Sequence, residues 1–169
     1  ELAELARQDD FYLVIDGYHG FMALPTDLSG IADRAFYIAG GYKYAMSGEG
    51  ACFMHCPPGL GLRPVNTGWF AGFGSLEAGV AEIGYAEGGM RFAGSTFDVS
   101  GLYRFNAVQS WLDELGVGVE DIHGRVVDLQ EQFLVGLAER EIDLGELVPP
   151  KNVTTRGHFL TFRSDRAGA

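Results

Sequence analysis

The chain has 169 residues, of which 47% are hydrophobic, and a formal net charge of −11 at pH 7. This length can bury one core and a second small one, whereas the negative charge works against binding nucleic acid or an anionic membrane surface. No run approaches the roughly 20 apolar residues of a membrane span, and the N-terminus does not resemble a secretory signal, so we expect a cytoplasmic protein that binds small molecules or other proteins.

The first expected elements are a short helix and a strand. Residues 2–8 carry leucine and alanine at helical spacing, which predicts the end of a surface helix. The apolar run 11–15 stops at Asp16, a pattern typical of a strand buried on both faces in a parallel sheet. Polar residues that follow such a strand lie at its carboxyl end, where open α/β sheets build their sites.

Two further apolar runs, 35–39 and 50–54, repeat the design of a strand followed by polar residues. The first leads into a glycine- and aromatic-rich segment, 40–48, in which Lys43 is the only charged residue. Only one other lysine, Lys151, occurs in the chain. A merely solubilising lysine is not expected in such surroundings, so Lys43 is a candidate functional residue.

The run 50–54 begins a segment that contains Cys52 and Cys56. In a strand, residues four apart are separated by about 13 Å, which is beyond the reach of a disulfide or a shared zinc ion. We therefore expect two structural cysteines and no metal site.

The second half of the chain changes from irregular to helical. Residues 59–98 are glycine-rich, and so long an irregular connection suggests a function. Helical spacing begins at Ser100 and stops at Gly116, a second helix fits residues 119–141, and a last strand fits residues 158–162. We expect an α/β fold in two parts: residues 1–98 belong to a large sheet domain, and residues 99–169 form an interdomain helix and part of a small α+β C-terminal domain.

Asp16 and Lys43 both follow apolar strands, so adjacent parallel strands would bring them to one edge of the sheet. Pyridoxal phosphate needs this pair, because a lysine holds its aldehyde as an imine and a carboxylate keeps its pyridine nitrogen protonated. The pair alone is a weak signal, since Asp-Gly after a strand is usually just a turn.

Five motifs follow one another along the chain: Val-Ile-Asp-Gly-Tyr-His at 14–19, Gly-Tyr-Lys-Tyr at 41–44, Ser-Gly-Glu-Gly at 47–50, Asn-Thr-Gly-Trp at 66–69 and Arg-Phe-Ala-Gly-Ser-Thr at 91–96. In this order they resemble the class V aminotransferase family, especially its kynureninase and isopenicillin-epimerase-like branches. The resemblance implies part of a fold-type I enzyme that uses pyridoxal 5'-phosphate. Such an enzyme acts on an amino-acid substrate through a Schiff base, and its homodimer shares the active site.

The resemblance also implies roles for single residues around the pyridine ring. Lys43 would be the catalytic Schiff-base lysine, and Asp16 would pair with the pyridine nitrogen. His19 would contact the ring near its phenolic oxygen. Read alone, His19 is more often a satisfied polar residue.

Four further residues match the family's phosphate contacts. Tyr42 and Trp69 would donate hydrogen bonds to the phosphate, and Ser95 or Thr96 would reach it from the partner subunit. The competing interpretations are two core aromatics and a helix cap.

Several alternatives stay open at this point. The reaction is a transamination, a kynureninase-like hydrolytic cleavage of the side chain or an epimerisation, and a non-catalytic scaffold of the same fold is the alternative from another class. We expect the family's phosphate loop, ring-stacking aromatic and substrate-carboxylate arginine to lie outside this chain, and we therefore expect an excerpt of a longer enzyme that is inactive by itself. Arg156 and Arg163 have the chemistry of a carboxylate clamp, but we expect them to be structural.

Overall fold

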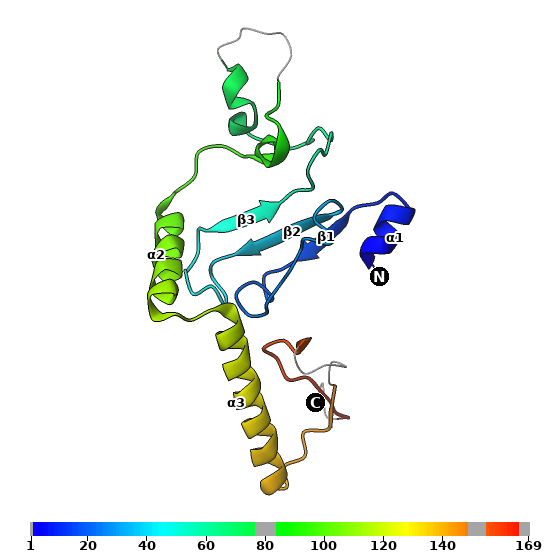
Figure 1. Cartoon of the computed structure of the whole chain (residues 1–169), viewed down its shortest axis with the longest axis vertical. Coiled ribbons are helices and arrows are strands. Elements are labelled where there is room, and N and C mark those ends of the chain that lie inside the picture. Colours follow the sequence, from blue (N-terminus) through cyan, green and yellow to red (C-terminus); the bar gives the residue numbers. More distant parts are fainter. Residues whose placement is uncertain (1, 77–83, 149–154, 166–169) are drawn as a thin grey trace.

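The computed structural model describes residues 2–76, 84–148 and 155–165. Its central sheet has three strands in the order β1 (Leu13–Asp16), β2 (Ala35–Gly40) and β3 (Cys52–His55) (Figure 1). β1 is parallel to β2, as predicted, and β3 is antiparallel to β2. The carboxyl ends of β1 and β2 therefore lie at the same end of the sheet, beside the start of β3.

Burial differs between the strands. β2 is the best-buried strand, with Ala35, Tyr37 and Ala39 in the core. β1 is not buried on both faces, because Val14 is 69% exposed. The prediction of a strand buried on both faces was therefore wrong. β1 pairs along one side only and is an edge strand of the described sheet, and no described layer covers the face that carries Val14.

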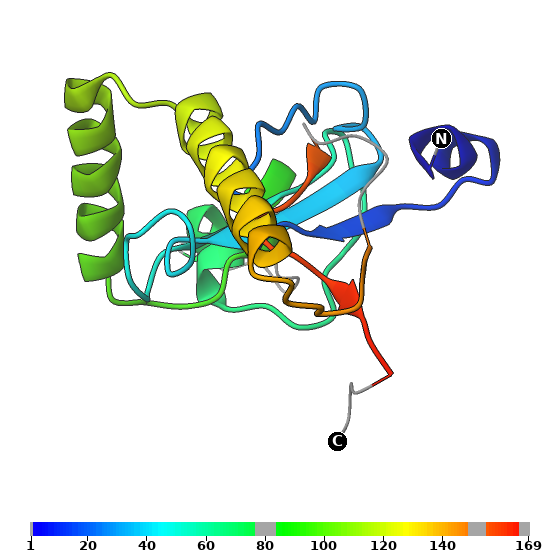
Figure 2. The ribbon, with the colours of Figure 1, turned by 90° about the horizontal axis from the view of Figure 1, so that it is seen from below.

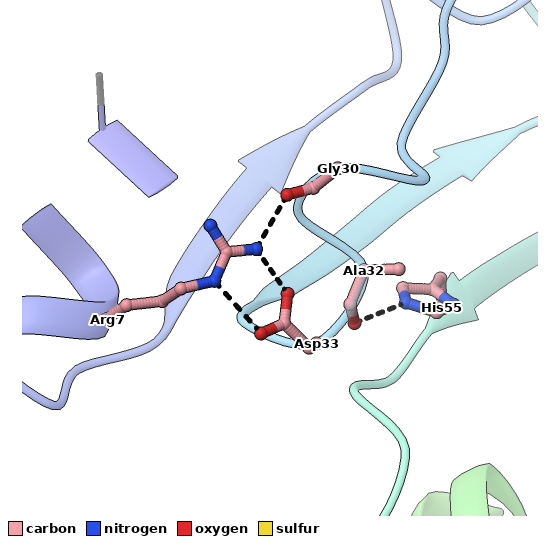
Figure 3. Close-up of polar contacts among 5 residues, drawn as sticks. All are labelled: Arg7, Gly30, Ala32, Asp33 and His55. Carbon is pink, nitrogen blue, oxygen red and sulfur yellow. Dashed lines mark hydrogen bonds and ion pairs between the residues drawn. The ribbon is translucent and has the colours of Figure 1, made fainter. Parts of the chain in front are cut away.

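Helix α1 (Leu2–Gln8) forms as predicted and is tied to the loop before β2. The Arg7 guanidinium donates to the Gly30 carbonyl at 2.7 Å and to both carboxylate oxygens of Asp33 at 2.7 and 3.2 Å (Figure 3). From β3, the His55 ring donates to the Ala32 carbonyl at 3.1 Å. These bonds hold the β1–β2 connection at the end of the sheet opposite the carboxyl ends of β1 and β2.

The glycine-rich region after β3 contains two short 3-10 helices, η1 (Trp69–Ser75) and η2 (Gly88–Phe92), which were not predicted. They pack together through the backbone around Gly68, whose N–H donates to the Ala93 carbonyl at 3.0 Å. A Cβ on Gly68 would lie 2.2 Å from the carbonyl oxygen of Gly94. Only glycine permits so close an approach.

The two predicted long helices are confirmed. α2 (Ser100–Leu115) ends at Gly116, which has a left-handed φ of 65°, and α3 (Val119–Glu139) ends two residues earlier than predicted. α2 stands beside the end of the sheet where β1 and β2 stop, and α1 lies at the opposite end (Figures 1 and 2). Of the helices that the structure describes, none is long and apolar enough to cross a membrane.

The last described elements form a small second sheet of β4 (Glu146–Leu147) and β5 (Phe162–Arg163), which are antiparallel. The predicted strand at 158–162 was wrong except for its last residue, and β4 was not predicted. The strand starts later than predicted because, among the described residues, only Phe162 and Arg163 of this segment pair with another strand. The ring of His158 packs edge-on against Tyr44 at 4.8 Å between centroids and stacks parallel to His123 at 5.9 Å.

Candidate functional site

Asp16 is the last residue of β1, and its carboxylate shapes the turn that follows. Oδ1 accepts a hydrogen bond from the Tyr18 backbone N–H at 3.0 Å, a local turn that aspartate commonly makes. Among the described residues no hydrogen bond reaches the other oxygen, Oδ2, and the side chain is exposed. The carboxylate is thus oriented by one oxygen and can accept a hydrogen bond with the other.

Lys43 lies in a short closed loop directly after β2. The Gly41 N–H donates to the Ala51 carbonyl at 2.8 Å, and the Ser47 N–H donates to the Gly41 carbonyl at 2.7 Å. The side chains of Ala45 and Ser47 are buried and anchor the loop to the protein core. The loop therefore presents Lys43 at the end of the sheet that also carries Asp16.

The lysine amine lies against an imidazole and two phenol rings. Nζ of Lys43 is 2.8 Å from Nε2 and 3.2 Å from Nδ1 of His19. It also lies 5.7 Å from the ring centroid of Tyr18 and 5.6 Å from that of Tyr42. Of the ion pairs among the described residues, none involves Lys43, so no carboxylate competes for its amine.

Tyr18 links this group to β3. Its hydroxyl donates to the sulfur of Cys52 at 3.2 Å, and its ring lies 5.4 Å from the ring of Tyr42. The hydrogen bond to Cys52 and then burial raise the pKa of Tyr18 to about 12, so its hydroxyl stays protonated at neutral pH. Cys52 and Cys56 are free cysteines.

Trp69, Ser95 and Thr96 form a separate group around η1 and η2. The ring of Trp69 packs against Phe70 at 4.4 Å between centroids, and Ser95 and Thr96 are exposed. Because β3 is antiparallel, the chain leaves it at the end of the sheet away from Lys43. Within the described residues, the structure therefore brings Asp16, His19, Tyr42 and Lys43 to one end of the sheet and leaves Trp69, Ser95 and Thr96 apart from them.

Helix α2 holds the Lys43 loop, a role that sequence patterns did not indicate. Arg104 donates from Nε to the Ser47 carbonyl at 3.3 Å and from a terminal nitrogen to the Glu49 carbonyl. The helix also comes so close to the loop that a Cβ on Gly101 would lie 2.4 Å from the carbonyl carbon of Gly50. A glycine in the first turn of a helix was the one available sequence signal for this contact.

A cavity of about 440 Å³ opens beside Lys43. One wall is formed by the lysine loop, with Lys43, Tyr44 and Met46, and His158 closes another side. The rest comes from the end of α2 and the start of α3: Trp111, Leu112, Leu115, Val117, Ile122 and Val126.

The two arginines near the chain's end have carboxylate partners within the protein. Arg156 is 6% exposed and pairs with Glu131 at 2.6 Å, and the exposed Arg163 pairs with Glu146 at 3.2 Å. These contacts agree with the expected structural role. Among the described residues no group of three or more histidine, cysteine, aspartate or glutamate side chains could hold a metal ion.

Comparison with solved structures shows a shared fold, whereas comparison of the sequence identifies no family. No protein-family profile matches the sequence, and no curated protein matches it significantly. A solved structure, the apo structure of cysteine desulfurase from Thermococcus onnurineus NA1, superposes with a TM-score of 0.72 at 16% identity, over 98% of this chain and 40% of that chain.

This likeness concerns the fold alone. The chain spans 40% of the length of the desulfurase chain, and its mixed α/β architecture matches part of that protein's fold-type I architecture, as predicted. The division into two domains at residues 98 and 99 stays a prediction.

Proposed function

We propose that this protein is a pyridoxal-phosphate-dependent enzyme of the class V aminotransferase family, that it acts on an amino acid, and that Lys43 carries the cofactor. One observation carries the proposal. Lys43, His19 and Asp16, which occupy the family's positions for cofactor residues, lie together at the carboxyl edge of a parallel strand pair, where open α/β sheets place their sites. The fold shared with a cysteine desulfurase supports it.

The donor set fits the cofactor. The amine of Lys43 has no carboxylate partner among the described residues, so it is available to an aldehyde. The free oxygen of Asp16 can accept the N–H of a protonated pyridine nitrogen, and a carboxylate favours that protonated form. Tyr42 and Trp69 would donate to the phosphate, and Ser95 or Thr96 would reach it from the partner subunit of a homodimer.

Two residues of this chain, Lys43 and His19, would act in moving the proton of the substrate's α-carbon. When bound, pyridoxal phosphate supplies an electron sink for the charge left at the substrate's α-carbon. Lys43 would take the proton of the substrate's α-carbon at Nζ. His19 holds that nitrogen by the 2.8 Å contact and so orients it.

Amino-group transfer is the first candidate reaction, and cleavage of the substrate's side chain is the second. The name cysteine desulfurase denotes loss of sulfur from cysteine rather than amino transfer, and the Tyr-Lys-Tyr segment at 42–44 resembles kynureninases, which also cleave a side chain. A product assay separates the two: transfer makes a new amino acid from an added keto acid, whereas cleavage of kynurenine releases anthranilate.

The decisive experiment is an absorbance spectrum of the full-length protein with pyridoxal phosphate, before and after borohydride reduction. We expect an absorbance band near the visible edge from the imine. Borohydride reduction of this imine should attach the cofactor covalently to the peptide that contains Lys43. Lys43→Ala should lose the band, and Lys151→Ala, which removes the only other lysine of this chain, should keep it. An unchanged spectrum in Lys43→Ala, or no band in the wild type, would refute the proposal.

A further inference from the structure

The cavity beside Lys43 has the size and surface of a site for an apolar group. Its volume of about 440 Å³ falls within the range of roughly 300–1,000 Å³ that small-molecule sites occupy. Six of its lining residues are apolar side chains of α2, α3 and the turn between them. Trp111 and Leu115 remain 52% and 55% exposed, so apolar surface is left for a ligand to cover.

The lining offers little to a charged group. Among the described residues that line the cavity, none is aspartate, glutamate or arginine, and Lys43 is the only cation. Burial and then the neighbouring His123 lower the pKa of His158, so its ring is neutral at neutral pH. Apart from Lys43, which the proposed function assigns to the cofactor, the described lining residues offer no charged partner that would compensate a charged ligand group for its lost hydration.

We infer that this cavity binds the side chain of the substrate, and that the substrate is an amino acid with a large apolar side chain, such as phenylalanine or leucine. The inference rests on the proposed function, because Lys43 places the cavity next to the substrate's reacting carbon. The geometry agrees: Lys43 belongs to both the cavity wall and the contact with His19. A side chain held against α2 and α3 therefore leaves its α-carbon near Nζ.

The test measures ligand binding to the full-length protein loaded with pyridoxal phosphate. L-phenylalanine, L-leucine, L-alanine and L-aspartate are titrated, and the change in the cofactor band gives each dissociation constant. In parallel, calorimetry measures the binding of 3-phenylpropanoate, which has no amine and cannot react with the cofactor. We expect phenylalanine and leucine to bind at least about tenfold more tightly than alanine or aspartate, because the cavity removes their apolar surface from water.

Two variants on α2 provide the matched comparison. Leu115→Glu places a carboxylate in the cavity wall at a position that is 55% exposed, and Leu102→Glu makes the same change at a 40% exposed position outside the cavity. We expect Leu115→Glu to weaken phenylalanine and 3-phenylpropanoate at least about tenfold and to leave alanine within about twofold. Leu102→Glu should change none of these constants.

The outcomes separate this inference from the proposed function. If phenylalanine binds no more tightly than alanine, or Leu115→Glu weakens both equally, the cavity does not hold the side chain, although the cofactor reaction with alanine would still support the proposed function. If no amino acid changes the band, the proposed function fails. Binding of 3-phenylpropanoate that Leu115→Glu abolishes would then still support an apolar site, and no binding of it would overturn that site as well.

Discussion

Nε2 of His19 lies 2.8 Å from Nζ of Lys43, although the two residues belong to separate loops that follow different strands. His19 sits in the turn after β1, and Lys43 sits in the closed loop after β2. Because these strands are parallel and adjacent, their following loops meet. The contact joins the two strongest motifs of the sequence into one site.

Replacing His19 with phenylalanine tests that contact. The ring of His19 packs edge-on against Phe159 at 5.3 Å between centroids, so a phenyl ring retains this packing while both nitrogens are lost. We expect kcat to fall by about 10- to 100-fold, because Nζ of Lys43 loses the group that orients it. The free energy of unfolding should hardly change, since His19 is exposed.

The control for this variant is His55→Gln, which alters a histidine that bonds the Ala32 carbonyl at the other end of the sheet. It should leave kcat unchanged. Equal losses in both variants would point to a general effect on the fold and would contradict a special role for His19.

The approach of α2 to the lysine loop predicts opposite effects of alanine at two helical glycines. At Gly101 the new methyl group would lie 2.4 Å from the carbonyl carbon of Gly50, so we expect the free energy of unfolding to fall by about 1–3 kcal/mol. At Gly124 of α3 a Cβ would have no neighbour within 4 Å among the described residues. There we expect a gain of about 0.8–1 kcal/mol, because alanine favours the helix. Denaturant unfolding measures both values, and a stabilised Gly101→Ala protein would refute the close packing.

Replacing Arg104 should make the lysine loop more mobile. Its guanidinium donates to the carbonyls of Ser47 and Glu49, so Arg104→Met should speed amide hydrogen exchange in residues 41–50. Arg104→Lys can restore only part of the effect, since an ammonium group cannot present the same planar fork of donors. Arg125→Met, at an exposed position of α3, is the control and should leave that exchange unchanged. Exchange in 41–50 that is equal in the Arg104 and Arg125 variants would show that Arg104 does not hold the loop.

The lowered pKa of His158 should make the free energy of unfolding depend on pH. Burial, followed by the proximity of His123, lowers its pKa, against a hydrogen bond with the Ala23 backbone that raises it. Below the usual histidine pKa of about 6.5, the unfolded chain therefore binds a proton that the folded chain does not bind. The free energy of unfolding should fall as the pH drops from 6.5 toward the lowered pKa of the folded state.

Two non-ionisable variants check this expectation by urea unfolding at pH 7.5 and 5.5. His158→Phe keeps an aromatic ring against Tyr44, and His158→Gln keeps a polar group. Both should show a smaller loss of stability between the two pH values than the wild type. An undiminished loss in both would assign the pH dependence to other groups.

Local patterns were sufficient for the helices and for part of the sheet. Helical spacing from Ser100 and the glycine after Leu115 predicted α2, because periodicity and a left-handed end residue depend on near neighbours in the chain. The apolar runs before Asp16 and Lys43 predicted the parallel pair β1–β2, and with it the position of both residues after the carboxyl ends of these strands.

Burial and side-chain pairing could not be predicted in this way. An apolar run is the same whether or not another layer covers its strand, so the exposure of Val14 depended on the absence of a described layer over that face of the sheet. The segment at 158–160 has the composition of a strand, yet His158 packs against Tyr44 and His123. Those rings come from distant parts of the chain.

The candidate chemistry can be read from the order of the amino acids: an unusual lysine, an aspartate at a strand end, and motifs whose order resembles that of a known family. How these residues are held, and what surrounds them, depends on contacts between distant parts of the chain. The bond from Arg104 to Ser47 joins residues 57 positions apart, and the cavity beside Lys43 has walls from the lysine loop, α2, α3 and His158. Such contacts arise from packing between elements, and the periodicity of any one segment contains no information about them.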